Sequence, residues 1–214
     1  MPAYLYLHHA LDLWFEKIVK PHCRGEAIIY RFADDFVCAF RYREDANRFY
    51  RALPKRLEKF NLQVAPEKTQ IIRFSRFHPT MRRRFTFLGF EFFWFNDRKG
   101  VARVKRRTSV KKLRTKLMKI TEWIRFNRHL PERKFFRVIN AKLRGHYNYY
   151  GVRGNSQSLW IFYFRVIATC FKWLNRRSQR KSYTWERFKR NLNQYYHILK
   201  PRITEKKRQH TVAY

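Results

Sequence analysis

The chain has few acidic residues, few cysteines and no long apolar run. It contains 15 Asp and Glu against 50 Lys and Arg, which gives a formal net charge of +35. Such a surface repels itself and favours a polyanion, most commonly nucleic acid bound through its phosphates. An anionic membrane surface is the alternative. Aromatic residues make up 19% of the chain, and exposed rings stack on unpaired bases, so we expect an RNA partner.

The three cysteines are scattered along the chain, at Cys23, Cys38 and Cys170. Their spacing gives neither a disulfide framework nor a zinc cluster, and it favours a reducing compartment such as the bacterial cytoplasm or an organelle matrix. The longest apolar run, residues 159–174, is interrupted by Arg165 and Lys172 and is too short to span a bilayer. The opening residues show no signal-peptide pattern. We therefore expect no membrane segment and no membrane partner.

Two adjacent aspartates, Asp34 and Asp35, lie between two short runs of β-branched and aromatic residues within residues 28–40. This pattern predicts a strand, a tight turn and a second strand, with both carboxylates at the tip. Hard cations such as Mg²⁺ are held by one or two carboxylates together with substrate phosphates. The stretch therefore predicts a metal site. A turn that uses Asp as a favoured turn residue is the alternative.

The rest of the first half alternates helical and strand patterns. The expected elements are helices over residues 1–20 and 43–60 and strands over residues 70–74, 85–94 and 101–107. Pro54 lies inside the second helix, where an interior proline loses a hydrogen bond and clashes with the preceding turn. We expect it to kink or split that helix.

From Thr108 onward the chain reads as helical. The first helix carries an apolar stripe of Val110, Leu113, Leu117, Ile120 and Ile124. Its lysines at positions 112, 116 and 119 face away and form a basic ridge, for which RNA binding and an ordinary solvated face are equally open readings. A second helix starts at Pro131, and residues 145–155 follow as a segment rich in glycine and aromatic residues. A third helix, residues 156–175, is apolar nearly all round and is expected to lie centrally. Thr184 caps a last helix that extends to about Tyr196.

Several motifs in order resemble the reverse transcriptase/maturase proteins encoded by group II introns. Residues 32–35 resemble the Tyr-Ala-Asp-Asp box of that family, with Phe32 in place of Tyr. Residues 62–69 resemble the next palm motif, and residues 87–90 resemble the strand that supports the primer end. Residues 143–152 resemble the most recognisable stretch of the maturase thumb, called domain X.

The resemblance implies an α+β fold: a partial polymerase palm of antiparallel hairpins and packed helices, followed by an all-α three-helix thumb. The implied domains are the palm over residues 1–107, domain X over residues 108–203 and a basic flexible tail over residues 204–214. It also implies a two-metal Mg²⁺ site in which Asp34 is the main ligand and Asp35 a second ligand or support. The implied partners are group II intron RNA and an RNA template with a DNA primer.

The resemblance further assigns residues to the substrates. The nucleotide or primer region comprises Phe32, Ala33, Lys68, Phe87, Leu88 and Gly89. The RNA-binding residues are Lys112, Lys116, Lys119, Arg144, Tyr147, Arg176 and Arg177. Two of these assignments have a simpler alternative explanation. For Lys68 the alternative is a surface lysine paired with Glu67 or solvent, which we favour slightly. For the Tyr-rich stretch the alternative is an aromatic loop packed on the core, which is compatible with the resemblance.

The family pattern is incomplete in this sequence. The fingers and the earlier third aspartate of the palm have no counterpart before the hairpin, since Asp12 lies on the opening helix in the wrong context. Two hypotheses follow: an RNA-directed DNA polymerase that acts with a separately encoded N-terminal half, or a non-catalytic RNA-binding maturase module with an idle metal hairpin. We expect the isolated chain to bind structured RNA with steep salt dependence and not to extend a primer. We also expect an apolar sheet face to be partly exposed.

Overall fold

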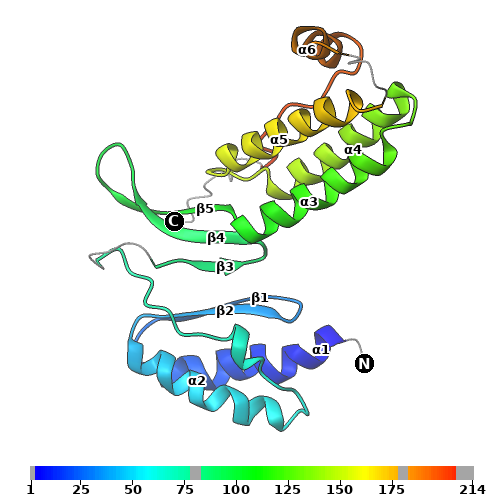
Figure 1. The fold of residues 1–214 in the computed structure, drawn as a ribbon. Coiled ribbons are helices and arrows are strands. Elements are labelled where there is room, and N and C mark those ends of the chain that lie inside the picture. The colour runs from blue at the N-terminus through cyan, green and yellow to red at the C-terminus, as the bar shows by residue number, and fades with distance from the viewer. Residues whose placement is uncertain (1–2, 78–82, 178–182, 206–214) are drawn as a thin grey trace. The chain divides into compact units, whose positions relative to one another are not determined.

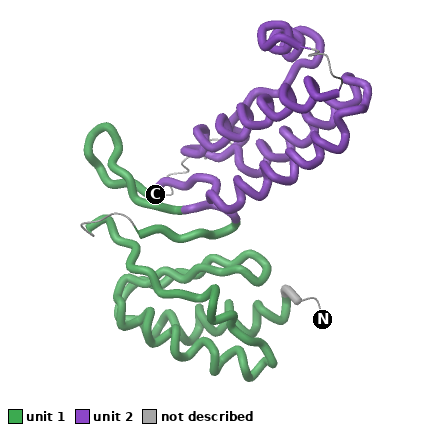
Figure 2. The backbone as a smooth tube through the Cα atoms, viewed as in Figure 1, with its two compact units in different colours: residues 1–88, 92–104 green, residues 89–91, 105–214 purple. Residues whose placement is uncertain are grey.

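The computed structural model describes residues 3–77, 83–177 and 183–205. The chain divides into two compact units (Figure 2). The N-terminal unit comprises Met1–Leu88 and Phe92–Val104, and the helical unit comprises Gly89–Glu91 and Lys105–Tyr214. Residues 178–181 of the basic linker and residues 206–214 of the basic tail lie outside the described residues. The palm and thumb boundaries expected from the sequence stay predictions.

The N-terminal unit opens with a helical stretch that confirms the expected first helix. It consists of α1 (Ala3–Leu7), π-helical turns at His8–Asp12 and Phe15–Val19, and a 3₁₀ turn at Lys20–His22. Its buried face carries Ala10, Leu11 and Phe15. Helix α2 (Arg43–Glu58) packs against this stretch and against β2.

Pro54 was expected to kink or split α2; the split is wrong, and the kink stays a prediction. The helix is a single element, with Pro54 on its exposed side. Phe49 and Leu53 lie before Pro54 in the helix, and Leu57 lies after it. All three side chains are buried in the same hydrophobic cluster. Burial of these side chains on both sides of Pro54 offsets the one backbone hydrogen bond that proline cannot donate.

The expected hairpin is confirmed. Strands β1 (Ala27–Phe32) and β2 (Asp35–Phe40) pair antiparallel in a register that joins Ala27 to Phe40 and Phe32 to Asp35. Alternate residues of β1 face opposite sides of the hairpin. Ala27 and Ile29 pack on the core, whereas Ile28, Tyr30 and Phe32 are exposed. The exposed apolar sheet face expected from the sequence is therefore present.

A three-stranded sheet follows, with the strand order β3 (Phe85–Phe87), β4 (Phe90–Asn96) and β5 (Ala102–Thr108). The strand expected over residues 101–107 is confirmed. The single strand expected over residues 85–94 is wrong, because Leu88 and Gly89 adopt positive φ angles of 50° and 77° and form a tight turn. The strand expected over residues 70–74 is also wrong. That segment forms no ladder and is held by the Phe74 ring, which packs on Phe85 and Trp94.

The helical unit comprises α3 (Val110–Asn127), α4 (Glu132–Tyr150), α5 (Ser156–Leu174) and α6 (Trp185–Gln194). Helices α3, α4 and α5 run side by side (Figure 1). Thr184 caps α6 as expected, because its side chain accepts a hydrogen bond from the Arg187 amide. The Gly- and Tyr-rich segment is not a separate element at its start, since α4 continues through Gly145 to Tyr150.

Two expectations about burial in the helical unit are wrong. Val110 is 66% exposed, so the apolar stripe of α3 is buried only from Ile120 to Ile124. Helix α5 is not buried all round, since Trp160, Ile161 and Phe164 are exposed. Its packing partners α3 and α4 cover one side only. The hydrophobic pattern of α5 predicted burial on all sides. A sequence pattern does not indicate which neighbouring helices are present to cover each side.

The C-terminal segment lies along α4. Tyr147 donates from its hydroxyl to the Leu199 carbonyl, and the amides of Thr204 and Glu205 donate to the Gly151 carbonyl. A Cβ at Gly151 would lie 2.2 Å from the Tyr147 carbonyl oxygen, so this position requires glycine. With its antiparallel hairpins followed by packed helices, the molecule confirms the expected α+β fold class.

Candidate metal centre and nucleic-acid surface

The hairpin places both candidate metal ligands at its tip. Asp34 is the second residue of the two-residue turn, and Asp35 opens β2 opposite Phe32. Ala33 has a φ of 54° while Asp34 does not have a positive φ, which is the sign pattern of a type II′ turn. Both carboxylates are exposed. No described residue donates a hydrogen bond or forms an ion pair with either of them.

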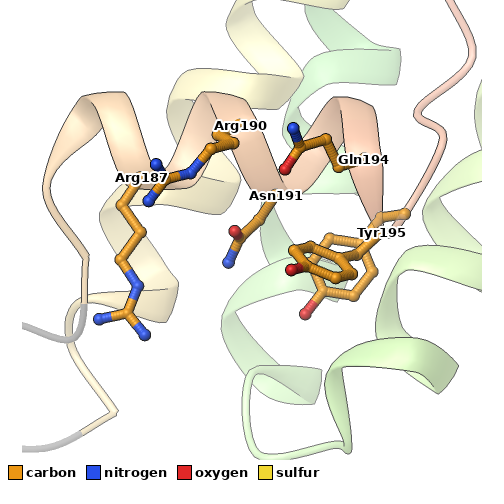
Figure 3. Close-up of a pocket in the computed structure, with 6 residues that line it drawn as sticks. Arg187, Arg190, Asn191, Gln194 and Tyr195 are labelled. Atoms are coloured by element: carbon orange, nitrogen blue, oxygen red, sulfur yellow. The ribbon is translucent and has the colours of Figure 1, made fainter.

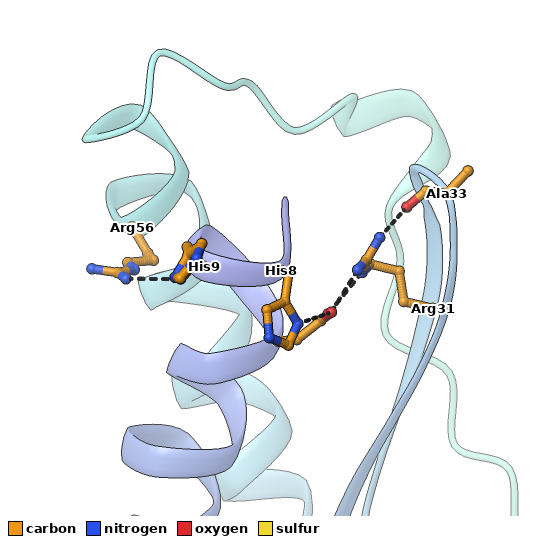
Figure 4. A network of polar contacts seen from close by, with 6 residues as sticks. His8, His9, Arg31, Ala33 and Arg56 are labelled. Carbon is orange, nitrogen blue, oxygen red and sulfur yellow. Dashed lines mark hydrogen bonds and ion pairs between the residues drawn. The ribbon is translucent and has the colours of Figure 1, made fainter. Parts of the chain in front are cut away.

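The turn is fixed by Arg31, the residue just before Phe32 (Figure 4). The Arg31 guanidinium donates from Nη1 to the Ala33 carbonyl at 2.8 Å. It also donates from Nε and Nη2 to the two carboxylate oxygens of Asp12, at 2.7 and 2.5 Å. The Arg31 side chain is only 5% exposed. The Asp12–Arg31 clamp therefore ties the opening helix to the backbone beside Asp34.

The Asp12–Arg31 clamp gives Asp12 a structural role. Burial alone would raise the pKa of the Asp12 carboxyl, but the hydrogen bonds from Arg31 and His8, together with their charges, outweigh it and lower that pKa. A bidentate guanidinium occupies both oxygens. Asp12 is thus a structural partner of Arg31, in agreement with its exclusion as a third metal ligand.

The chemistry of the hairpin fits a hard cation in part. Two carboxylates that no described residue donates to are oxygen ligands of the type that Mg²⁺ prefers, and Mg²⁺ commonly takes its other ligands from water and phosphates. In the part of the chain that the structure describes, no group of three or more His, Cys, Asp or Glu side chains is placed to hold a metal. Asp34 and Asp35 would therefore share an ion with ligands from outside this set.

The residues expected in the nucleotide or primer region fall into three places. Phe32 and Ala33 belong to the β1–β2 hairpin, and Phe32 is 66% exposed. Phe87, Leu88 and Gly89 form the end of β3 and the turn after it, and β3 lies against β2 within the N-terminal unit. Lys68 is exposed on the 3₁₀ turn Pro66–Lys68 and makes no ion pair with Glu67, so its partner is solvent.

The turn at Gly89 is anchored to the start of α3. The Gly89 carbonyl accepts a hydrogen bond from the Ser109 amide at 2.9 Å. A Cβ on Gly89 would lie 3.0 Å from the Tyr150 hydroxyl, at a φ of +77°. Both the backbone angle and the space available therefore favour glycine.

The basic ridge of α3 is exposed as expected. Lys112, Lys116 and Lys119 lie three and four residues apart and so share one face of the helix. Glu122 is the one acid of α3, and no described residue forms an ion pair with these lysines. Arg144 on α4 is likewise exposed and free of ion pairs within the described residues.

Two of the residues expected to bind RNA do not have that role in the structure. Tyr147 is 1% exposed and donates its hydroxyl to Leu199, so it is a core residue. Arg177 is half-buried, donates to the Leu130 carbonyl at 2.9 Å and pairs with Glu132. Arg176 stays exposed, with its guanidinium over the Trp173 ring. The alternative reading of the Tyr-rich stretch, packing on the core, holds for Tyr147.

The sequence patterns missed a cluster of cations around Trp173. Besides Arg176, the ring has three cationic neighbours within 6 Å of its centroid, namely Arg125, Arg128 and Lys172. They come from the ends of α3 and α5, which pack together. Since the two helix ends are about 45 residues apart in the chain, only the packed structure brings these charges together. This Trp173 cluster adds to the cationic surface of the helical unit.

His146 is a further residue that the patterns left aside. It is buried, its ring stacks on Phe162 with centroids 3.7 Å apart, and neither ring nitrogen has a partner among the described residues. Burial, and secondarily the charge of Lys116, lowers the pKa of His146 to about 4. The imidazole is therefore neutral near pH 7 and acts as a core ring.

Comparison with known proteins gives one match. Residues 3–92 match the family model described as reverse transcriptase (RNA-dependent DNA polymerase). The matched segment includes the metal hairpin, Lys68 and the Leu88–Gly89 turn, and it ends before α3. No curated protein matches the chain. Among the described residues, no helix combines the length and hydrophobicity that a membrane crossing requires.

The fold, the candidate site and the family match meet in the N-terminal unit. Its hairpin, its exposed aspartate pair and its similarity to reverse transcriptases all concern the same residues. Residues 3–92 are thus a reverse-transcriptase-like segment with the aspartate pair at its hairpin tip.

Proposed function

We propose that this protein is a reverse transcriptase/maturase of the group II intron type, which directs DNA synthesis on an RNA template and also binds intron RNA to assist its splicing. The observation that carries the proposal is the hairpin tip. Two exposed carboxylates that receive no hydrogen bond from any described residue lie there, inside the segment similar to reverse transcriptases, in a chain of net charge +35.

In this proposal Asp34 and Asp35 hold Mg²⁺. A divalent cation bound there would stabilise charge on the attacking 3′-hydroxyl and on the leaving pyrophosphate. The protein's own part is to present the ligands. Arg31 fixes the turn through the Ala33 carbonyl and leaves both carboxylates unneutralised. The two carboxylates repel each other, so a cation between them would also relieve that repulsion.

The primer would lie beside the hairpin. The exposed Phe32 ring is on the same face of the hairpin as Asp35, because the two residues are paired. The turn at Leu88 and Gly89, following β3, is the second element that we assign to the primer end. Lys68 is exposed and unpaired within the described chain, and the solvated-lysine reading remains the simpler one.

The RNA would bind the helical unit through its phosphates. The basic ridge of α3, together with Arg144 and Arg176, presents exposed cations with few acids to neutralise them. Cations of this kind bind by releasing counterions from the nucleic acid, so binding weakens steeply with salt. The three free cysteines suit a reducing compartment, the bacterial cytoplasm or an organelle matrix.

A second candidate function is a non-catalytic RNA-binding maturase module. The described residues provide no third carboxylate, histidine or cysteine near the aspartate pair, and this observation favours the second candidate for the polypeptide acting alone. Under the first candidate, a separately encoded N-terminal half would supply the missing ligand and the fingers.

A salt titration of RNA binding tests the part that both candidates share. We expect binding of a structured RNA, measured by filter binding, to weaken steeply between about 50 and 200 mM salt. Replacing Lys112, Lys116 and Lys119 by Gln should lower the salt slope by about two to three. The matched control replaces Lys17, Lys55 and Lys59, which are exposed in the N-terminal unit. An equal effect in the control, or binding insensitive to salt, would refute the ridge as an RNA site.

Primer extension by the purified chain tests whether it polymerises without a separately encoded half. We expect no incorporation of deoxynucleotides by the purified chain on a primed RNA template with Mg²⁺. Incorporation that depends on Mg²⁺ and disappears in Asp34→Ala would show that the chain is a complete polymerase and would rule out the second candidate.

A further inference from the structure

A polar groove lies along α6 of the helical unit, and none of its lining residues is among those assigned to RNA above. It is lined by Arg187, Arg190, Asn191, Gln194, Tyr195 and Tyr196 and has a volume of about 700 Å³ (Figure 3). Small-molecule sites commonly have volumes of about 300 to 1,000 Å³. The groove therefore has room for a nucleotide.

The position of α6 forces these polar residues outward. Phe188 and Leu192, four residues apart, are buried and pin one side of the helix to the core. Arg187, Asn191 and Gln194 follow at the same helical spacing on another side. The groove is thus a fixed face of a packed helix.

The hydrogen-bonding groups of this face are unused. No described residue forms an ion pair or hydrogen bond with the Arg187 or Arg190 guanidinium, nor with the side-chain amides of Asn191 and Gln194. Guanidinium groups bind phosphate oxygens through two parallel hydrogen bonds. Side-chain amides carry both a donor and an acceptor and can pair with a base edge.

The two tyrosines of the groove differ in their surroundings. The Tyr196 ring stacks on Phe136 with centroids 4.3 Å apart, and its hydroxyl donates to Glu132. Tyr195 has a ring 71% exposed, on a backbone held by the bond from its amide to the Asn191 carbonyl. The Tyr196 side chain is therefore fixed in place and forms one side of the groove. Tyr195 offers a free ring, the kind of platform on which unpaired bases stack.

We propose that the α6 groove binds an unpaired nucleotide of single-stranded RNA. The base stacks on Tyr195, the phosphates bind Arg187 and Arg190, and the amides of Asn191 and Gln194 contact the base edge. The inference rests on the RNA-binding part of the proposed function and adds a stacking site to it. It needs neither the metal hairpin nor the ridge of α3.

The test measures binding of a fluorescent oligouridine of about eight nucleotides by anisotropy, in EDTA so that no divalent metal contributes. We expect Tyr195→Ala to weaken binding at least about fivefold, since base stacking is worth about 1–3 kcal/mol. Tyr195→Phe should bind within about twofold of the parent, because the ring is retained. The double variant Arg187→Gln and Arg190→Gln should lose about tenfold and lower the salt slope by about 1.4.

Lys189→Gln is the matched control on the same helix. Lys189 lies on the opposite side of α6 from Arg187, over the Trp185 ring, so its loss should have a smaller effect per charge. Photocrosslinking with 5-iodouridine, followed by peptide mass spectrometry, should place the crosslink on Tyr195.

Three outcomes would overturn the inference. Tyr195→Ala could bind as tightly as the parent, or Lys189→Gln could weaken binding as much per charge as the arginine variants. Free uridine triphosphate could also compete as well as the oligonucleotide, which would make the ligand a free nucleotide. Circular dichroism of each variant checks that it folds. Because structured RNA and Mg²⁺ are tested separately, failure here leaves the proposed function standing, and the reverse also holds.

Discussion

Glu132 in the helical unit and the Asp34–Asp35 pair in the N-terminal unit have opposite surroundings. Glu132 accepts hydrogen bonds from the hydroxyls of Tyr183 and Tyr196 and pairs with Arg177. Asp34 and Asp35 receive no bond from any described residue. Donors are not scarce in a chain of net charge +35. Arg31 even reaches the turn, yet it bonds the Ala33 carbonyl and Asp12 and leaves both tip carboxylates free.

The difference separates acids that hold elements together from acids that have no partner among the described residues. Asp12 and Asp45 resemble Glu132 in having protein partners. Asp12 forms an ion pair with Arg31. Asp45 accepts a hydrogen bond from the Arg24 amide and forms an ion pair with Arg48. An acid that holds elements together should be costly to remove. An acid kept free for a ligand should cost almost nothing in stability.

The largest effect is expected for Asp12→Ala. The substitution leaves the Arg31 guanidinium, only 5% exposed, without its carboxylate. Breaking a fully buried pair costs about 3–5 kcal/mol, and because Asp12 is 22% exposed we expect a loss at the lower end of that range. Urea unfolding should show the loss, and hydrogen exchange should accelerate over residues 27–40. His8→Ala is the control, because its contact with Asp12 is more exposed and is worth about 1 kcal/mol or less. Equal losses in the two variants would contradict the clamp.

Glu132→Ala should come next, with a loss of about 3 kcal/mol, because hydrogen bonds to a charged acceptor contribute about 1.5–3 kcal/mol each and their loss is partly regained through water. Helix α6 and the segment after it should exchange faster, since Tyr183 and Tyr196 flank α6. Glu122→Ala removes an exposed acid of α3 and should change little. An unchanged stability in Glu132→Ala would show that the carboxylate is dispensable.

Alkaline pH should weaken the same contact. Burial first, and then the hydrogen bond and charge of Glu132, raise the pKa of the Tyr183 hydroxyl from 10.0 to about 12. Because the folded value lies above the unfolded one, this stabilisation is complete below about pH 10 and is lost as the pH rises through about 12. Ultraviolet titration of tyrosinate should show a transition near pH 12 that Tyr183→Phe removes. Ionisation of every tyrosine near pH 10 would count against this contact.

The smallest stability effect is expected at the hairpin tip. Asp34→Asn and Asp35→Asn remove exposed charges without described partners, so the free energy of unfolding should stay within about 0.5 kcal/mol of the parent. Thermal unfolding without added metal measures it. A loss as large as that of Asp12→Ala would mean that the tip carboxylates are structural.

The local elements of the fold could be read from the sequence. Two short runs of β-branched and aromatic residues on either side of the aspartate pair predicted the hairpin, and Thr184 predicted the start of α6. The turn at Leu88 and Gly89 was missed, because the aromatic residues on both sides favour a strand and leucine does not mark a positive φ. Gly89 was the one signal of an interruption within residues 85–94. Contacts between distant elements were also invisible. The Asp12–Arg31 clamp joins a helix to a strand, and only α4 packing shows that Tyr147 faces inward.

The candidate sites also differ in how far the sequence could predict them. Asp34 and Asp35 stood out because adjacent acids are rare in so basic a chain. Tyr195 and Tyr196 are identical neighbours, and the sequence gives no sign that one is fixed by Phe136 and Glu132 while the other is exposed. Their difference depends on where α6 ends against α4, which is a property of the packed unit.

The central claim is that the hairpin tip is kept free in order to hold a divalent cation. A titration of the purified chain with Mn²⁺, followed by electron paramagnetic resonance and competed with Mg²⁺, tests it directly. We expect a binding site that Asp34→Asn weakens at least about tenfold and that Glu58→Gln, the loss of another exposed acid, leaves unchanged. Mn²⁺ binding of equal strength in the parent, Asp34→Asn and Asp35→Asn would contradict the claim.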